Sequence, residues 1–271
     1  MNTMDLLYEK IEELLKGSLC IAYSGGVDSS LLLKVASDIN KDNRYVLYAV
    51  TFNTKLHPVK DIEISSKLAK EMGVAHEIIE IDELKNEEIL NNSVNRCYFC
   101  KKFMFQKLVD FANENGIQNI IDGTNLDDLS TYRPGLKALK ELNIKSPFVE
   151  LGIDKSTVRK LANDLGISVA NRPSAPCLAT RIPYNTKLDL GLLNRIDRCE
   201  NEIKTMGFDV VRLRVHDDIV RIEVKKEDIR RIIDNSHRII NLLKSNGFTY
   251  ITVDIEGFRS GSMDIHTNEG K

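Results

Sequence analysis

The sequence predicts an α/β fold in which a doubly wound parallel sheet occupies residues 1–186 and a smaller α+β domain follows in residues 187–271. Two observations support this prediction. First, short apolar stretches of strand length alternate with segments whose apolar residues recur at helical spacing, which is typical of a parallel sheet covered on both faces. Second, the pattern changes near Asn185, after which two segments alternate apolar and polar residues as in a hairpin.

The first domain begins with an amphipathic helix at residues 4–16, where five aliphatic side chains fall at helical spacing. An apolar run at 19–23 then predicts a buried strand. The same alternation predicts strands at 45–52, 76–81 and 119–122, and helices at 28–39, 59–72, 98–115 and 154–165. Because ligands bind beyond the carboxyl ends of such strands, we expect the loops after Tyr23, Phe52 and Asp122 to form the functional site.

The second domain shows a different order of elements. A helix at 189–206 leads into the segment 210–215, where apolar and polar side chains alternate, and the segment 219–224 alternates again after an Asp-Asp turn. This pair predicts an antiparallel hairpin with one polar face. A helix at 226–246 and a last strand at 250–255 complete a small α+β domain.

Composition and charge argue against several classes of protein. Lys and Arg number 38 against 40 Asp and Glu, a net charge of −2, whereas nucleic-acid binders usually carry a basic surplus. The longest apolar run, Tyr45–Val50, is far shorter than a membrane span, and the acidic amphipathic N-terminus does not resemble a signal peptide. The five cysteines therefore suggest a reducing cytoplasm, where paired cysteines are ligands or catalysts more often than disulfides.

A segment rich in glycine and serine follows the first predicted strand and opens the next helix. Its sequence is Ser24-Gly25-Gly26-Val27-Asp28-Ser29-Ser30. The glycines let backbone amides turn inward, and a helix N-terminus adds N–H groups and a partial positive charge, which together bind phosphate. The serines can donate to phosphate oxygens, and Asp28 can cap the helix or help to hold Mg²⁺. The segment matches neither a Walker loop nor a dinucleotide fingerprint.

This segment resembles the pyrophosphate loop of the ATP pyrophosphatase superfamily, which has the PP-loop or adenine nucleotide alpha hydrolase-like fold. Those enzymes split ATP between its α- and β-phosphates, adenylate a carbonyl or carboxylate, and let a nitrogen or sulfur nucleophile displace AMP. The resemblance implies ATP and Mg²⁺ as cofactors and Asp28 as a catalytic residue. At the next strand end, Thr51 and Phe52 are expected to flank the adenine or ribose. The alternative is an ordinary strand-to-helix turn capped by Ser or Asp.

Longer blocks elsewhere resemble one family of that superfamily. They are Asp122-Gly123-Thr124-Asn125-Leu126-Asp127-Asp128, Arg172-Pro173-Ser174-Ala175-Pro176-Cys177-Leu178-Ala179-Thr180-Arg181 and Glu256-Gly257-Phe258-Arg259-Ser260-Gly261-Ser262. In this order, and over nearly the whole chain, the blocks look like the LarE family of ATP-dependent sulfur transferases. The resemblance implies that Asp122, Thr124 and Asn125 belong to the ATP site.

The LarE family matures the nickel-pincer nucleotide cofactor of lactate racemase and related enzymes. Its substrate is pyridinium-3,5-biscarboxylic acid mononucleotide, whose carboxylates are adenylated in turn and converted to thiocarboxylates. Some members give up the sulfur of one cysteine, which matches Cys177, and leave dehydroalanine. The resemblance therefore implies a cytoplasmic, homo-oligomeric sulfurtransferase that forms AMP and pyrophosphate and takes its sulfur from sulfide or another donor.

The five cysteines fall into two groups. Cys20 lies in a predicted buried strand and Cys199 on the helix that opens the second domain, so both are expected to be structural. Cys97 and Cys100 form a Cys-x-x-Cys pair at a helix start, and Cys177 lies in a proline-rich loop. A zinc site would need a fourth ligand that no Cys or His is obviously spaced to supply. Three thiolates instead suit a [4Fe–4S] cluster with one open iron that binds sulfide.

Cluster-bearing members of the LarE family resemble this chain in having the additional Cys-x-x-Cys pair. We therefore favour a cluster held by Cys97, Cys100 and Cys177 over sacrifice of Cys177 as the route of sulfur.

The mononucleotide carries a phosphate and carboxylates, so its binding needs cations. Arg212 and Arg214 lie two residues apart on one face of a strand and are expected to clamp the phosphate. Arg181 and Arg259 lie within family-like blocks and are further substrate-binding candidates. The alternative for the strand is a solvated face on which these arginines pair with Glu223 across the hairpin.

Two sets of residues receive no role from the sequence. Glu200 and Glu223 match acidic positions that resemble a family metal site, although acids on helices and hairpins usually lie on the surface. The histidines are scattered without ligand spacing, at His57, His76, His216, His237 and His266.

Three other functions fit part of the pattern. A tRNA thiolase of the same superfamily would use the same loop, three cysteines and a cluster, but it should carry a basic face, which the charge balance disfavours. An ammonia-using amidoligase would need no cysteines. A non-catalytic nucleotide-binding module would bind ATP without releasing pyrophosphate.

Overall fold

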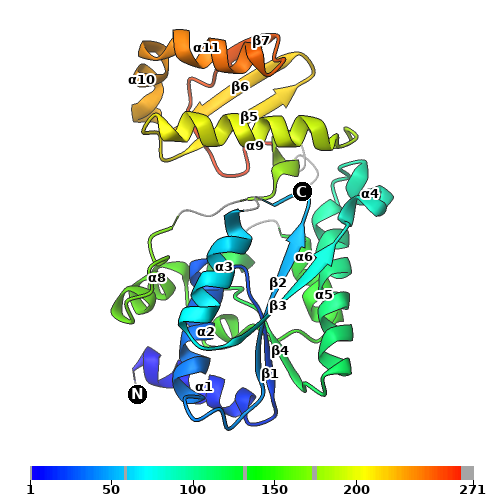
Figure 1. The fold of residues 1–271 in the computed structure, drawn as a ribbon, viewed down its shortest axis with the longest axis vertical. Coiled ribbons are helices and arrows are strands. Elements are labelled where there is room, and N and C mark those ends of the chain that lie inside the picture. Colours follow the sequence, from blue (N-terminus) through cyan, green and yellow to red (C-terminus); the bar gives the residue numbers. More distant parts are fainter. Residues whose placement is uncertain (1, 58–59, 131–132, 173–175, 264–271) are drawn as a thin grey trace. The chain divides into compact units, whose positions relative to one another are not determined.

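The chain forms two compact units (Figure 1). The computed structural model describes residues 2–57, 60–130, 133–172 and 176–263. Unit 1 comprises residues 1–84 and 95–175, and unit 2 comprises residues 85–94 and 176–271. The expected boundary after residue 186 lies inside unit 2, because the turn η3 (Leu178–Arg181) packs against the first long helix and first strand of that unit.

Unit 1 is built on a four-stranded parallel sheet in the order β3-β2-β1-β4. Its strands are β1 (Leu19–Ala22), β2 (Leu47–Thr54), β3 (Ala75–Ile81) and β4 (Asn119–Ile121). Leu19 of β1 pairs with Leu47 on one side and with Asn119 on the other. The winding therefore reverses between β1 and β4, which is where doubly wound sheets bind ligands.

Helices cover both faces of this sheet (Figure 1). The longer ones are α1 (Thr3–Leu15), α2 (Val27–Ile39), α3 (Lys60–Glu71), α5 (Arg96–Glu114) and α8 (Lys155–Asp164). Alternate residues of β1 serve different cores: Leu19 and Ile21 pack in the core formed with α1, α2 and α8, whereas Cys20 packs with Phe105 and Leu108 of α5. The predicted doubly wound α/β fold is confirmed.

Shorter helical elements lie in unit 1 and in residues 85–94, a segment that belongs to unit 2. They are η1 (Glu83–Lys85), α4 (Glu87–Leu90), η2 (Leu126–Leu129), α6 (Gly135–Glu141) and α7 (Pro147–Glu150). Of these, α6 packs against α5 and α7 against α1. The sequence pattern had not predicted these short helices, which are too brief to show a helical period.

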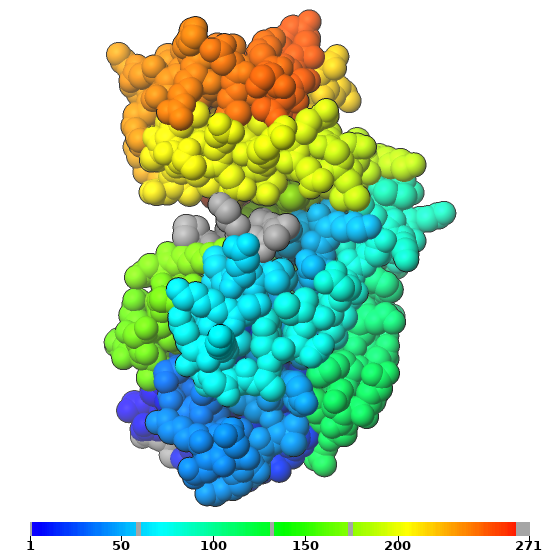
Figure 2. Space-filling model, in the orientation of Figure 1, coloured from blue at the N-terminus to red at the C-terminus, as the bar shows by residue number. Residues whose placement is uncertain are grey.

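Unit 2 has the predicted order α-β-β-α-β. Its elements are α9 (Leu190–Thr205), β5 (Val211–His216), β6 (Ile219–Val224), η4 (Lys226–Asp228), α10 (Ile229–Asp234), α11 (Ser236–Ser245) and β7 (Tyr250–Val253). The strands β5 and β6 pair antiparallel, and β7 adds parallel to β6. The side chains of α9 form a continuous band across unit 2 in Figure 2.

One expectation for unit 2 is wrong in detail, and one alternative is excluded. The helix predicted at 226–246 breaks at Asn235, whose side chain donates to the Arg231 carbonyl at 2.8 Å and so competes with helix continuation. The polar face of the hairpin is buried, since Arg212 is 7% and Arg214 4% exposed, so the alternative of a solvated face is wrong.

Candidate active site

The phosphate loop leaves β1 and enters α2 where the sequence predicted it. Gly25 has φ +67°, and a Cβ there would lie 3.1 Å from the backbone of Ser65, so the turn requires glycine. The Ser29 hydroxyl accepts from the Ser24 N–H at 3.2 Å and donates to the Gly26 carbonyl at 3.3 Å. The loop is thus fixed by its own serines, and the first N–H groups of α2 have no intrahelical partner and suit an anion.

The loop after β4 meets the phosphate loop closely. A Cβ at Gly123 would lie 2.9 Å from Asp28 Cβ and 3.0 Å from the Ser29 nitrogen. Nearby, Asn125 Nδ2 donates to Asp28 Oδ1 at 3.2 Å, and Lys155 Nζ forms an ion pair with the other carboxylate oxygen. The fold therefore brings together Asp28 and Asn125, as expected, and adds Lys155, which sequence reasoning missed.

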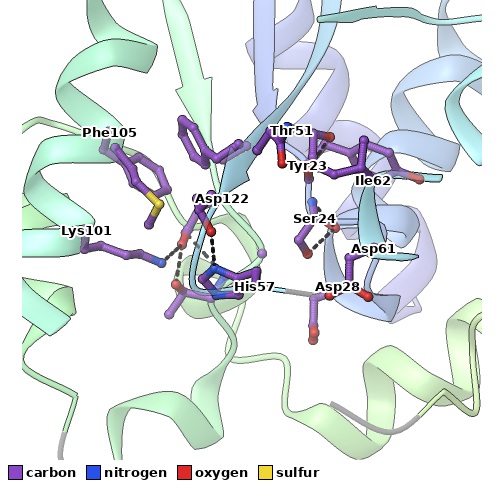
Figure 3. Close-up of a pocket in the computed structure, with 18 of the residues that line it drawn as sticks. Tyr23, Ser24, Asp28, Thr51, His57, Asp61, Ile62, Lys101, Phe105 and Asp122 are labelled. Carbon is purple, nitrogen blue, oxygen red and sulfur yellow. Dashed lines mark hydrogen bonds and ion pairs between the residues drawn. The ribbon is translucent and has the colours of Figure 1, made fainter. Parts of the chain in front are cut away.

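A cleft of about 380 Å³ opens at this edge of the sheet (Figure 3). This volume is within the range of small-molecule sites. The predicted residues that line it are Ser24, Asp28, Ser29, Thr51, Phe52, Asp122 and Thr124. Ser30 differs from the other loop serines, because it is fully buried and its hydroxyl donates to the Tyr23 hydroxyl at 3.4 Å.

The Thr51 hydroxyl connects three strands. It donates to the Tyr23 carbonyl at 2.7 Å and therefore accepts from His76 Nε2, also at 2.7 Å. Burial lowers the pKa of His76, which is half-buried on β3. At this strand end the side chain of Thr51 is already hydrogen-bonded within the protein.

The far wall of the cleft joins a buried carboxylate to a lysine. Asp122 accepts from Thr124 Oγ1 at 2.5 Å and from Ser146 Oγ at 2.6 Å. Lys101 Nζ lies 3.6 Å from Asp122 Oδ2 and 4.9 Å from the centre of the Phe105 ring. Lys101 thus lines the cleft, and Lys155 pairs with Asp28, which also lines it. The sequence had singled out neither lysine, although Lys101 directly follows the Cys-x-x-Cys pair.

The cysteine thiols are divided between the units. Cys97, exposed, and Cys100, half-buried, lie on the first turns of α5 in unit 1 at the i, i+3 spacing that places them on one helix face. Cys177 is half-buried in unit 2, directly before η3. Within the described part of the chain, no group of three or more Cys, His, Asp or Glu side chains gathers where it could hold a metal ion.

The other two cysteines are core residues, as expected. Both are completely buried, and burial raises the pKa of Cys20 to about 12 and that of Cys199 to about 11.

The predicted arginines of unit 2 lie in a buried charge network. Arg181 Nε and Nη2 donate to the two oxygens of Glu200 at 2.7 and 3.0 Å. Arg214 Nε donates to Glu223 at 3.0 Å, and its Nη1 donates to the Thr180 carbonyl at 2.8 Å. Glu200 and Glu223 are therefore buried partners of arginines and not the surface acids that the alternative reading would make them.

Arg212 belongs to the same network of buried charges. Arg212 Nη1 lies 4.0 Å from Glu200, so Arg181, Arg212 and Arg214 face two glutamates, and all five side chains are at most 8% exposed. Burial, with Arg181 nearby, lowers the pKa of Arg212 to about 10, which leaves it a cation at neutral pH.

Arg259 is connected to this network through Asp254 and Arg221, because Arg221 Nη2 also lies 3.4 Å from Glu223. Its guanidinium forms ion pairs with Asp254 at 3.3 Å and with Glu256 at 2.7 Å, and Asp254 also pairs with Arg221. Arg259 is about one-third exposed, so it is the most accessible of the four predicted substrate-binding arginines.

Comparison with known proteins assigns the chain to a family. The family described as a PP-loop domain matches residues 3–132, which contain both loops of the cleft. A pyridinium-3,5-bisthiocarboxylic acid mononucleotide synthase of Lactiplantibacillus plantarum is 36% identical over 245 residues, 90% of this chain and 88% of the relative. The chain belongs to the LarE family. An uncharacterised protein of Synechocystis is 37% identical over 246 residues, 90% of this chain and 91% of its own length.

Membership of the LarE family makes the chain an ATP-using sulfurtransferase. A tRNA-specific 2-thiouridylase of Rickettsia typhi is more distant, at 25% identity over 58% of the chain and 53% of that enzyme. Among the described residues, no helix is long and apolar enough to cross a membrane.

Proposed function

We propose that the chain adenylates the carboxylates of pyridinium-3,5-biscarboxylic acid mononucleotide and converts them to thiocarboxylates, in the synthesis of the nickel-pincer cofactor that lactate racemase uses. The main support is the 36% identity, over 90% of the chain, to the L. plantarum synthase of the bisthiocarboxylic product. The cleft in unit 1 and the buried arginines in unit 2 add independent physical support.

In unit 1, the loop at Ser24–Ser30 binds the phosphates of ATP, and Thr51 and Phe52 flank the adenine or ribose. Mg²⁺, when bound, neutralises phosphate charge, and Asp28 is the carboxylate placed to hold it. Lys155, paired with Asp28, supplies a cation on the same side of the cleft. The substrate carboxylate attacks the α-phosphorus, the bond to the β-phosphate breaks, and pyrophosphate leaves. The acyl-adenylate then carries AMP as a good leaving group.

In unit 2, Arg212 and Arg214 bind the substrate phosphate. Arg212 and Arg214 project from one face of β5 and are buried, where a charge-assisted hydrogen bond is strong. Arg181 holds the network together through Glu200, and Arg259 is the further cation available to a carboxylate.

We infer that Cys97, Cys100 and Cys177 hold a [4Fe–4S] cluster, which when bound supplies sulfide. Two observations support a fit: all three donors are thiols, and the two on α5 share one helix face with Cys97 exposed. Sacrifice of the Cys177 sulfur is the alternative. Turnover separates the two routes, because sacrifice removes one sulfur from the chain for each thiocarboxylate made.

The setting of the enzyme follows from the same family. A homo-oligomer in the cytoplasm is implied by the LarE resemblance, and reduced thiols such as the exposed Cys97 persist in that compartment. We further propose that unit 1, in place of the expected residues 1–186, performs the ATP chemistry, and that unit 2 binds substrate and supports assembly.

Pyrophosphate release tests the proposed function. With ATP and Mg²⁺, the enzyme should release pyrophosphate when the mononucleotide is added and not when unmodified tRNA is added. The reverse preference would favour the tRNA thiolase, and loss of 2-thiouridine from tRNA in a deletion strain would support that alternative. Release that depends on ammonia and survives Cys97→Ser would indicate an amidoligase.

A further inference from the structure

His57 lies in the cleft but has no role in the proposed function. It follows β2 and lines the cleft together with Thr54, whose Oγ1 is 2.7 Å from His57 Nδ1. In Figure 3 the labelled ring lies between Lys101 on one side and Asp28 with Asp61 on the other. His57 therefore faces the space that the cleft offers to a ligand.

The segment that presents His57 is held by a buried carboxylate. Glu83 is completely buried and accepts from the Leu56 N–H at 2.7 Å and from the Lys55 N–H at 3.2 Å. Lys55 Nζ also forms an ion pair with Asp82 at 2.9 Å. These bonds fix the backbone on the N-terminal side of His57, and Thr54 fixes its ring, so the imidazole is oriented before any ligand binds.

The surroundings of His57 favour the neutral imidazole. Burial lowers its pKa, and Lys101 on α5 adds to this effect, whereas Glu83 and Asp61 oppose it. A threonine hydroxyl can rotate to accept from Nδ1–H, which leaves the lone pair of Nε2 open. The same hydroxyl still accepts from Nδ1–H after Nε2 takes a proton, so proton uptake needs no rearrangement.

We propose that His57 is the general base of the sulfur-transfer step. This inference rests on the proposed function. The sulfur of an S–H nucleophile forms a bond to the acyl carbon of the adenylate, and the bond from that carbon to the AMP oxygen breaks, with its electron pair leaving on AMP. The S–H proton passes to Nε2 of His57. No oxidant or reductant is needed. Hydrosulfide gives the thiocarboxylate directly, whereas a cysteine thiol gives a thioester whose Cβ–S bond must then break by elimination, which leaves dehydroalanine.

His76 provides a matched control. It too has a threonine oxygen 2.7 Å from a ring nitrogen, and burial lowers its pKa as well. It does not, however, line the cleft. If His57 were only a packed core histidine, the two positions would respond alike to substitution.

The test measures the two half-reactions separately in His57→Gln and His76→Gln. Without a sulfur donor, both variants should release pyrophosphate with the mononucleotide as the wild type does. With sulfide, His57→Gln should make thiocarboxylate about 10²–10⁴-fold more slowly, while His76→Gln should match the wild type. Imidazole should partly restore His57→Ala. At constant hydrosulfide concentration, the fall of the wild-type rate towards acid pH should be absent from His57→Gln.

Results that contradict the role of His57 differ from a result that contradicts the proposed function. A His57→Gln enzyme that makes thiocarboxylate at the wild-type rate, or that loses both half-reactions together, would overturn the assignment. If His57→Gln does not fold by circular dichroism, Thr54→Val replaces it, with slower sulfur transfer and unchanged pyrophosphate release expected. A wild-type enzyme that releases no pyrophosphate with the mononucleotide would instead refute the proposed function.

Discussion

Breaking the buried ion pair between Arg181 and Glu200 should strongly destabilise unit 2. Arg181 is 3% exposed and donates to both oxygens of Glu200, and its Nη1 donates to Thr180 Oγ1 at 2.7 Å. Arg181→Ala would leave Glu200, 1% exposed, with the Leu213 N–H at 2.9 Å and with Arg212 at 4.0 Å. The substitution therefore strands a carboxylate that has almost no access to water.

The expected cost follows from this burial. Removing one partner of a buried ion pair destabilises a protein by about 3–5 kcal/mol. The double variant Arg181→Leu/Glu200→Leu buries neither charge, so it should recover at least about 2 kcal/mol of that loss. Recovery should be incomplete, because the Leu213 N–H then lacks its carboxylate acceptor.

The assay is urea unfolding of the full chain followed by far-UV circular dichroism. The four proteins of the double-mutant cycle give the coupling energy between the two side chains. A loss below about 1 kcal/mol in Arg181→Ala would refute the reasoning, since surface pairs contribute that little. A double variant no more stable than Arg181→Ala would show that the stranded carboxylate is not the cause.

Three further predictions concern the sites and their titration. Asp28→Ala should abolish pyrophosphate release while the circular dichroism spectrum stays unchanged, and undiminished release would contradict the role of Asp28. Arg214→Ala should weaken mononucleotide binding by about 1.5–3 kcal/mol, or about 10- to 150-fold, with ATP binding unchanged by calorimetry; equal affinity would return this strand face to a purely structural role. Burial lowers the pKa of His57, His76 and His216, so below about pH 6.5 the unfolded chain takes up protons that the folded chain does not. The free energy of unfolding should therefore fall towards acid pH, and His76→Gln should reduce that slope; an identical slope in the variant would show that His76 does not contribute.

Local sequence patterns predicted the part of the fold that forms the ATP cleft. The run at Leu19–Ala22, the glycine turn and the helix from Val27 are adjacent in the chain, so strand, phosphate loop and helix could be read together. The strand-end rule then placed the loop after β4 beside them, and the bond from Asn125 to Asp28 shows that the two loops meet.

Contacts between distant residues could not be predicted in this way. Lys155 meets Asp28 across more than 120 positions, and a lone lysine at a helix start resembles any surface residue. The sequence around Glu83 does not indicate that its side chain is completely buried and accepts hydrogen bonds from the Lys55 and Leu56 N–H groups. Such partners depend on the assembled fold and not on local spacing.

The hairpin of unit 2 was ambiguous for a related reason. Alternation predicted two faces for β5, but it does not say what covers the polar one. Glu200 of α9 and Glu223 of β6 neutralise much of the charge of Arg212 and Arg214. This pairing lowers the free-energy cost of burying the polar face of β5.

The most direct test of the proposed function is product analysis in a single anaerobic reaction. Purified enzyme is incubated with ATP, Mg²⁺, sulfide and pyridinium-3,5-biscarboxylic acid mononucleotide, and both the small molecules and the intact chain are weighed by mass spectrometry. The account predicts AMP, pyrophosphate and a thiocarboxylated mononucleotide, more than one thiocarboxylate per chain, and no loss of mass at Cys177. Loss of one sulfur from Cys177 per thiocarboxylate would contradict the cluster route, and ATP consumption without any thiocarboxylate would contradict the function itself.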